Sequence, residues 1–261
     1  MTLQNSLPGN TTANRYGSIA AEIYDIDKPV GALPDTAYYL ARLADIDGPI
    51  LEPACGSGRT LIPLLRSGHS VAGFDPSGEM LDRCRAGCAA LGFSPDLSRQ
   101  RFEDFSYDQP FAAIVLPMGS FTLIDDYARA MAVLARFHAH LVTGGRLIVD
   151  IASIAWLAET SEDRRRWTAE NGDLLTLEGK RVATDWLTQR AESLLRYERW
   201  RDNALVESQM EPMAQRYWGI EEFRLALEAS GFAEITVTGC YRPGQAPTSA
   251  VRAITFEAIR K

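Results

Sequence analysis

A chain of 261 residues with 46% hydrophobic and 23% charged residues has the composition of an ordinary globular protein. Its net charge of −7 argues against a broad phosphate-binding surface, so we expect a small-molecule substrate and no nucleic acid. Four cysteines without a Cys-x-x-Cys pair predict no metal site, and the lack of a signal sequence or long apolar run predicts a cytoplasmic protein without membrane contact.

Two helices are expected before the first strand. Apolar residues recur at helical spacing over residues 15–26, after a polar tail at 1–13. A second helix is expected from about Pro34 to Ala44, with Asp35 in its first turn, where its charge favours the helix dipole. Residues 1–30 are therefore expected to form a tail and a helical cap.

A short apolar strand, a tight glycine turn and an apolar helix follow at residues 49–66. Gly56 and Gly58 let the backbone turn and approach a ligand closely, and a helix beginning near Arg59 directs free N–H groups to the same place. Glu52 stands just before the turn. Its carboxylate would repel a pyrophosphate and attract a cationic amino group, so the charge favours S-adenosylmethionine over NAD.

Strands and helices then alternate up to residue 151. Ser70 to Asp75 has the pattern of a buried strand that ends in an acid. The further expected elements are a helix at 77–91, a weak strand near 98–102, a strand at 111–116, a helix at 125–141, a turn at Gly144-Gly145 and a strand at 146–151. This alternation predicts an α/β fold with a doubly wound parallel sheet.

The pattern changes after residue 151. Residues 172–218 alternate polar and apolar side chains, with turn signals at Gly179 and Asp202-Asn203, which predicts an antiparallel β insertion. A helix at 220–230 and strands at 235–240 and 250–259 complete the sheet. We therefore expect a cofactor-binding domain at 31–151 and 219–261, and a β-rich substrate cap at 152–218.

The motif Glu52-Pro53-Ala54-Cys55-Gly56-Ser57-Gly58, together with Asp75 and the strands around it, resembles class I, Rossmann-like, S-adenosylmethionine-dependent methyltransferases. The resemblance covers about residues 35–151 and 219–261. It implies a seven-stranded, mostly parallel sheet with an antiparallel last strand. It is closest to bacterial small-molecule enzymes with a hairpin insertion after the fifth strand, among them amino-sugar N-methyltransferases. A third glycine, frequent in the family, is replaced here by Arg59.

The resemblance implies a set of cofactor contacts. It places the methionine part of S-adenosylmethionine beside Ala54, Gly56 and Gly58, with Glu52 near its amino end. Asp75 ends the second strand and is followed by Pro76. A carboxylate there can accept hydrogen bonds from both ribose hydroxyls.

The adenine and sulfur ends of the cofactor are assigned by position. Phe102 is our choice for the adenine edge, with Glu103 or Asp104 as a polar partner, although Arg101 stands where the family often has an acid. Met118, in the segment after the fourth strand, is the expected contact near the sulfur. The alternative for the two acids is a solvated loop.

Four residues are candidates for orienting or deprotonating the acceptor. Tyr16 and Tyr24 lie in the N-terminal helix, where aromatic packing is the structural alternative. Asp150 ends the fifth strand, beside the expected methyl-transfer crevice. Glu170, in the insertion, is a weaker candidate.

Other charged side chains are expected to be structural. The three histidines, His69, His138 and His140, lie in segments remote from the expected site. The run Arg164-Arg165-Arg166 is expected to be the solvated face of a helix, with contact to an anionic acceptor as the alternative.

The expected function is S-adenosylmethionine-dependent methyl transfer to a nitrogen, oxygen or carbon of a small molecule in specialised metabolism, with a homodimer as one possible assembly. One alternative is a nucleotide-dependent Rossmann oxidoreductase, whose Gly-x-Gly-x-x-Gly spacing fails because position 61 is Leu. The other is a non-catalytic cofactor-binding subunit that acts with a partner.

Overall fold

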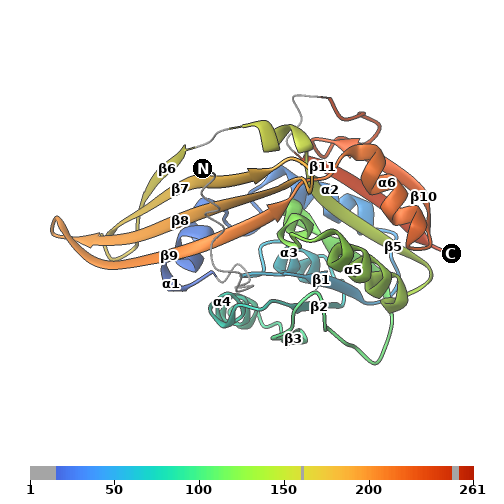
Figure 1. Cartoon of the computed structure of the whole chain (residues 1–261). Helices are drawn as coiled ribbons and strands as arrows, with labels where there is room; N and C mark the ends of the chain where they lie inside the picture. Colours follow the sequence, from blue (N-terminus) through green and yellow to red (C-terminus); the bar gives the residue numbers. More distant parts are fainter. Residues whose placement is uncertain (1–15, 160–161, 249–252) are drawn as a thin grey trace.

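A seven-stranded sheet and a four-stranded sheet form the framework of the computed structural model (Figure 1), which describes residues 16–159, 162–248 and 253–261. The predicted tail and the first residues of the predicted 250–259 strand lie outside the described residues. The strand order of the larger sheet is β10-β11-β5-β4-β1-β2-β3. Its strands are β1 (Ile50–Pro53), β2 (Val71–Phe74), β3 (Leu97–Ser98), β4 (Phe111–Leu116), β5 (Leu141–Ala152), β10 (Phe232–Gly239) and β11 (Ala253–Arg260).

The larger sheet is parallel except at β11, which pairs antiparallel with both β5 and β10. The predicted α/β class and the antiparallel last strand are therefore confirmed. The order reverses between β1 and β4, so the chain crosses from one half of the sheet to the other there. In doubly wound sheets, ligands bind at the carboxyl ends of the strands at such a switch point.

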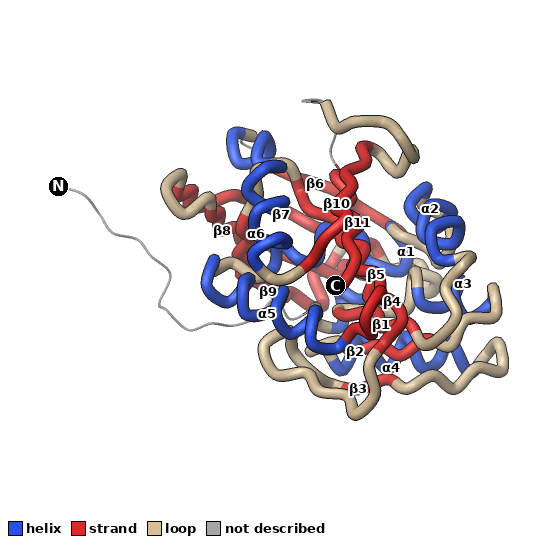
Figure 2. Tube along the Cα trace, turned by 90° about the vertical axis from the view of Figure 1, so that its right-hand side faces the viewer, coloured by secondary structure: helices blue, strands red, loops and turns tan. Residues whose placement is uncertain are grey.

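Helices cover both faces of this sheet because each strand alternates its side chains between two cores. In β4, Ile114 and Leu116 join a core with α5 (Tyr127–His140) and α6 (Ile220–Ala229), whereas Ala113 and Val115 face the other core. That second core is completed by α2 (Pro34–Leu43), α3 (Leu61–Arg66) and α4 (Gly78–Ala89). Figure 2 shows α5 and α6 on one side of the sheet and α2 and α3 on the other.

The insertion is a four-stranded antiparallel sheet in chain order. Its strands are β6 (Glu162–Thr168), β7 (Leu174–Asp185), β8 (Arg190–Arg201) and β9 (Ala204–Arg216). It begins about ten residues earlier than the alternation predicted. Asp202 and Asn203 form the predicted turn, with φ of 48° and 63°.

Gly179 was wrongly expected to mark a turn. It lies within β7, where a Cβ atom would approach Leu195 Cδ2 to 3.2 Å, so close packing against the next strand explains the glycine. The turn predicted at Gly144-Gly145 is likewise within β5: Gly144 has a φ of 78° where the register with β4 shifts. Both glycines mark irregular packing inside a strand.

The N-terminal helix α1 (Ser18–Asp27) packs against the smaller sheet rather than standing alone. Ile19, Ala20 and Ile23 share a core with Leu175 and Tyr197 of that sheet. Figure 1 shows α1 beneath β8 and β9. None of the described helices is long and apolar enough to cross a membrane.

Side chains of β9 cap the start of α1. Glu211 accepts the backbone N–H groups of Tyr16 and Gly17, the latter over 2.6 Å. Gln209 Oε1 accepts the N–H of Ile19 over 3.3 Å. The first amides of a helix have no partner within it, so these contacts attach α1 to the smaller sheet.

Candidate active site

The glycine turn after β1 runs through left-handed backbone. Ala54, Gly56 and Gly58 have φ of 53°, 55° and 89°. A Cβ atom on Gly58 would lie 2.8 Å from the Cys84 sulfur, whereas nothing lies within 4 Å of a Cβ on Gly56. Gly58 is thus required by packing, and Gly56 leaves open space in which a ligand can approach the backbone.

Asp75 connects this turn to the end of β2. Its Oδ2 accepts the N–H of Gly56 over 3.0 Å, and its Oδ1 accepts the N–H of Ser77 over 2.8 Å. Burial raises the pKa of Asp75 to about 6, and the two backbone N–H groups oppose that rise. The carboxylate retains lone pairs that further donors, such as the two hydroxyls of a ribose, can satisfy.

Glu52 is a buried carboxylate with an unsatisfied oxygen. Its side chain is 2% exposed, and its Oε2 has no hydrogen-bond partner among the described residues. Burial raises the pKa of Glu52 well above its ordinary value, and the charge of Arg59 opposes the rise. Such a group is costly unless a donor or a cation reaches it.

Arg59 forms a buried ion pair that the sequence did not reveal. Its Nη1 and Nη2 donate to the two oxygens of Asp35 over 2.8 and 2.7 Å, and both side chains are buried. The pair attaches the start of α2 to the glycine turn. The only local feature of the sequence that could have indicated this pair is the arginine at the position of a third glycine, beside a turn that is buried in the structure.

The two tyrosines of the cap contact the same region, but Tyr16 precedes α1 with a left-handed φ of 44° and was wrongly expected within the helix. Tyr24 and Tyr16 pack edge to face with centroids 5.9 Å apart, and the carbonyl of Tyr16 accepts the Ser77 hydroxyl over 3.0 Å. Burial raises the pKa of both phenols; the charge of Arg59 opposes the rise for Tyr24. Both are protonated at neutral pH and can orient a ligand as hydrogen-bond donors or acceptors.

A second left-handed turn follows β4. Met118 and Gly119 have φ of 60° and 72° within the 3-10 segment η1 (Pro117–Leu123), and the Met118 side chain is 41% exposed. The N–H of Met118 donates to Asp150 Oδ2 over 2.8 Å. Because β4 lies between β1 and β5, this turn stands between the glycine turn and the end of β5.

Comparison with known proteins finds similarities to one class of enzyme. The sequence of residues 50–145 matches the protein family described as "Methyltransferase domain". A cypemycin N-terminal methyltransferase of a Streptomyces species is 24% identical over 158 residues, 59% of this chain and 62% of that protein. The match therefore spans less than two thirds of the relative's length.

Two solved structures share the fold of nearly the whole chain. An S-adenosylmethionine-dependent methyltransferase from Clostridium acetobutylicum has a TM-score of 0.77 at 19% identity, over 92% of this chain and 97% of its own. A sugar N-methyltransferase from Streptoalloteichus has a TM-score of 0.76 at 17% identity, over 100% and 98%. The chain therefore shares the fold of these methyltransferases.

The residues of this chain fit S-adenosylmethionine, the predicted cofactor, on their own chemistry. The Oε2 of Glu52 and the Nε of Arg59 both lack a partner among the described residues, so they suit the ammonium and the carboxylate of the methionine part. Asp75 keeps lone pairs beyond its two backbone donors, so it suits the hydroxyls of a ribose. The buried acids Glu52 and Asp75 also favour a ligand that carries a sulfonium cation.

The other predicted residues are less closely grouped. Pro76 lies between Asp75 and Ser77, and its carbonyl accepts Arg99 Nε over 3.0 Å. The ring of Phe102 packs edge to face on Phe74 at 6.0 Å, beside the end of β2.

The two remaining acids differ in their surroundings. Glu103 is exposed and lies 3.5 Å from a guanidinium nitrogen of Arg129. Glu170 is exposed in the turn between β6 and β7, on a different sheet from Glu52, Asp75 and Asp150.

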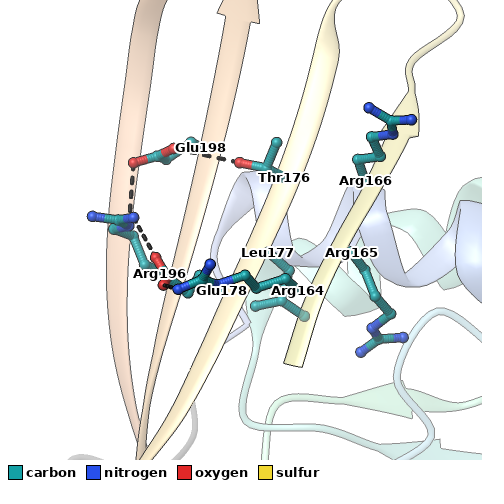
Figure 3. Close-up of a pocket in the computed structure, with 8 residues that line it drawn as sticks. All are labelled: Arg164, Arg165, Arg166, Thr176, Leu177, Glu178, Arg196 and Glu198. Atoms are coloured by element: carbon teal, nitrogen blue, oxygen red, sulfur yellow. Dashed lines mark hydrogen bonds and ion pairs between the residues drawn. The ribbon is translucent and has the colours of Figure 1, made fainter. Parts of the chain in front are cut away.

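The arginine run was wrongly expected to be a helix face. Residues 164–166 lie in β6, because an antiparallel partner, β7, pairs with all three. Arg165 contacts Asp27 of α1 over 2.8 Å, whereas Arg164 pairs with Glu178 on the opposite face of the sheet. Figure 3 shows the groove on that face, where Arg196 pairs with two glutamates. Arg164, Glu178 and Arg196 are in register across three strands, on the face opposite to the Arg165 contact with α1.

The rings of two histidines are partly buried and pack against aromatic residues of the core. His140 packs on Phe105 with centroids 4.7 Å apart, and His138 packs edge to face on Phe232 at 5.3 Å. Both lie at the end of α5, whose following strand enters the sheet at its amino edge. Neither is near the two left-handed turns, which follow the carboxyl ends of β1 and β4.

Proposed function

We propose that the protein transfers the methyl group of S-adenosylmethionine to an uncharged amine of a small molecule. The observation that carries the proposal is the buried Glu52 carboxylate beside the glycine turn, with one oxygen lacking a partner among the described residues. An unpaired buried acid at the switch point calls for a cationic ligand. A pyrophosphate cofactor would place like charges together there.

An amine acceptor is supported by what the related proteins are named for. The Streptomyces relative is an N-terminal methyltransferase, and the Streptoalloteichus structure is a sugar N-methyltransferase. Acids also predominate around the site: Glu52, Asp75 and Asp150 are all buried near its edge, and a methylated amine leaves the transfer step as a cation. The negative charge at this edge suits a reaction in which positive charge passes from sulfur to nitrogen.

In this mechanism the bound cofactor supplies a methyl group activated by its sulfonium, and the protein supplies alignment and exclusion of water. Glu52 and Arg59 hold the amino-acid end of the cofactor, and Asp75 holds the ribose. The Met118 turn lies beside the transfer path. Tyr16 and Tyr24, both protonated because burial raises their pKa, orient the acceptor without removing its proton.

An acceptor that arrives as a neutral amine needs no base before transfer, because its lone pair is already free. The surplus proton is lost after the methyl group has moved, when the product ammonium reaches solvent. This order of steps needs no base beside the acceptor, which agrees with the surroundings of Asp150. Its side chain is 1% exposed, and its oxygens accept hydrogen bonds from protein donors. A rate that rises with pH through the pKa of the free acceptor amine is therefore expected.

Calorimetry and mass spectrometry test the proposal together. S-Adenosylhomocysteine is titrated into the purified protein, and a panel of amino sugars and short peptides is incubated with S-adenosylmethionine and examined for products one methyl group heavier. Binding and an N-methylated product are expected. The matched variants are Glu52→Gln, expected to weaken binding, and Glu228→Gln on the exposed side of α6, expected to be neutral.

The two alternative functions have their own outcomes. Binding of NADH without binding of S-adenosylhomocysteine would replace methyl transfer by oxidoreductase chemistry. Binding of S-adenosylhomocysteine with methylation only after a second protein is added would identify a cofactor-binding subunit.

A further inference from the structure

Met118 adopts a backbone conformation that its side chain disfavours. Left-handed backbone brings the Cβ of an L-residue close to the following carbonyl oxygen, and here Gly119 follows in the same conformation. Without an external constraint, a methionine would leave this conformation for the extended or helical region. The surrounding structure must therefore hold it.

The constraint comes from Asp150. Its side chain is 1% exposed, and its Oδ2 accepts the Met118 N–H over 2.8 Å. The same oxygen accepts the Tyr241 hydroxyl over 2.9 Å, and Oδ1 accepts the Thr255 hydroxyl over 2.7 Å. Every described partner donates, so the ionised carboxylate acts here as an acceptor only.

These partners come from separate parts of the sheet. Thr255 belongs to β11, which pairs directly with Asp150 in β5, and Tyr241 follows β10. The buried hydroxyl of Tyr39, from α2, adds to the surroundings and has its own pKa raised by burial and by the charge of Asp150. The carboxylate is therefore fixed on the sheet, with little room to turn towards a substrate.

We propose that Asp150 is a positioning residue that holds the Met118-Gly119 turn in its left-handed conformation beside the methyl-transfer site. The proposal rests on the proposed function, in which this turn borders the cofactor. In this proposal Asp150 affects the alignment of the methyl-transfer site through Met118. Asp150 does not take a proton from the acceptor. Thr255 and Tyr241 hold the carboxylate in the orientation that this contact needs.

Glycine at position 118 provides the decisive variant. Glycine adopts left-handed backbone at almost no cost, so a turn that carries Met118→Gly no longer needs the constraint. Asp150→Asn keeps the size of the side chain but replaces one accepting oxygen by an NH₂ group. That group would face partners that are themselves hydrogen-bond donors. The two changes and their combination form a double-mutant cycle, in which coupling measures the action of Asp150 through residue 118.

The expected result is a kcat lower by roughly 10- to 100-fold in Asp150→Asn, because misplacement by about 1 Å is enough for such a loss. The dissociation constant of S-adenosylhomocysteine should change by less than roughly threefold, since residues of the other turn hold most of that ligand. In the Met118→Gly background, Asp150→Asn should lower kcat by less than roughly threefold. Equal losses in both backgrounds would overturn the proposal.

Hydrogen exchange supplies a measurement independent of activity. In Asp150→Asn the amides of residues 118–123, which follow Pro117, should exchange at least roughly tenfold faster than in the parent protein, while those of α5 remain protected. Unchanged exchange at 118–123 would refute the positioning role even if no acceptor were found. Failure of the parent protein to bind S-adenosylhomocysteine would instead refute the proposed function, and exchange would still test Asp150.

Discussion

The two turns at the carboxyl edge of the larger sheet, after β1 and after β4, resemble each other and differ in one respect. Both run through left-handed backbone, and each lies beside a buried carboxylate. The acid of the first turn, Glu52, retains an oxygen without a described partner, whereas that of the second, Asp150, accepts three donors. A buried acid without donors is suited to a ligand, and one with donors maintains the structure.

The largest effect is expected from breaking the ion pair between Asp35 and Arg59, which supports the first turn. Asp35→Asn would leave the Arg59 guanidinium buried without its counter-ion, so the free energy of unfolding should fall by about 3–5 kcal/mol. Urea denaturation of the cofactor-free protein measures this. Asp45→Asn is the control, because Asp45 pairs with Arg146 at the surface and should cost about 1 kcal/mol or less. Equal losses of stability in the two variants would show that burial does not make the Asp35–Arg59 pair more important than the Asp45–Arg146 pair.

Neutralising Glu52 should have opposite effects on binding and folding. Glu52→Gln removes a charged acceptor for the cofactor's ammonium, so the affinity for S-adenosylhomocysteine should fall by about 1.5–3 kcal/mol. The cofactor-free protein should be no less stable, because burial already favours the neutral form of Glu52 and Gln is neutral and of similar size. Calorimetry and thermal melting measure the two quantities. Loss of stability with unchanged affinity would make Glu52 a structural acid like Asp150.

The pH dependence of cofactor binding should have a defined sign. Burial raises the pKa of Asp75 from 3.8 to about 6, so its contribution to folding is complete below 3.8 and is lost as the pH rises through 6. Ribose hydroxyls favour the ionised form, so binding should release protons. Affinity should therefore rise between about pH 5 and about pH 7, by at most about tenfold per pH unit for each proton released.

Asp75→Asn is the matched variant for this measurement. It should remove the part of the slope that belongs to Asp75 and leave any part that belongs to Glu52, whose pKa is also raised by burial. Calorimetry in two buffers of different ionisation enthalpy counts the protons released. An affinity that falls with pH over the same interval would contradict the assignment of Asp75 to the ribose.

The smallest effect is expected at the tip of the smaller sheet. Glu170 is exposed in the β6–β7 turn, so Glu170→Gln should change stability by less than about 0.5 kcal/mol and kcat by less than about twofold. Steady-state kinetics with the best acceptor of the panel measures this. A much larger loss of kcat would show that the acceptor reaches this turn, as the sequence prediction allowed.

Local patterns predicted the parts of the fold that local physics determines. The glycine turn, the acid after β2 and the strand and helix alternation follow from spacing along the chain, and the structure contains all of them. Gly179 misled because glycine marks both turns and close packing between strands. The arginine run misled because helices and strands are told apart by the spacing of their apolar residues. Three consecutive charged residues contain no such spacing.

The contacts that give Asp35 and Asp150 their roles join residues far apart in the sequence. Asp35 meets Arg59 after 24 residues, and Asp150 meets Tyr241 and Thr255 after 91 and 105. No periodicity or motif links such positions, since they meet only when the sheet has been assembled. The sequence could identify Asp150 as an acid at the right edge, but not the donors that surround it.

The capping of α1 by β9 has a consequence for protein engineering. Because Glu211 and Gln209 accept the first amides of this helix, residues 16–27 and 162–216 depend on each other across nearly two hundred positions. A chimaera that exchanges the smaller sheet alone would leave the helix start without its acceptors. Recombination between relatives should therefore transfer the two segments together, as one cassette, so that the start of α1 keeps its acceptors.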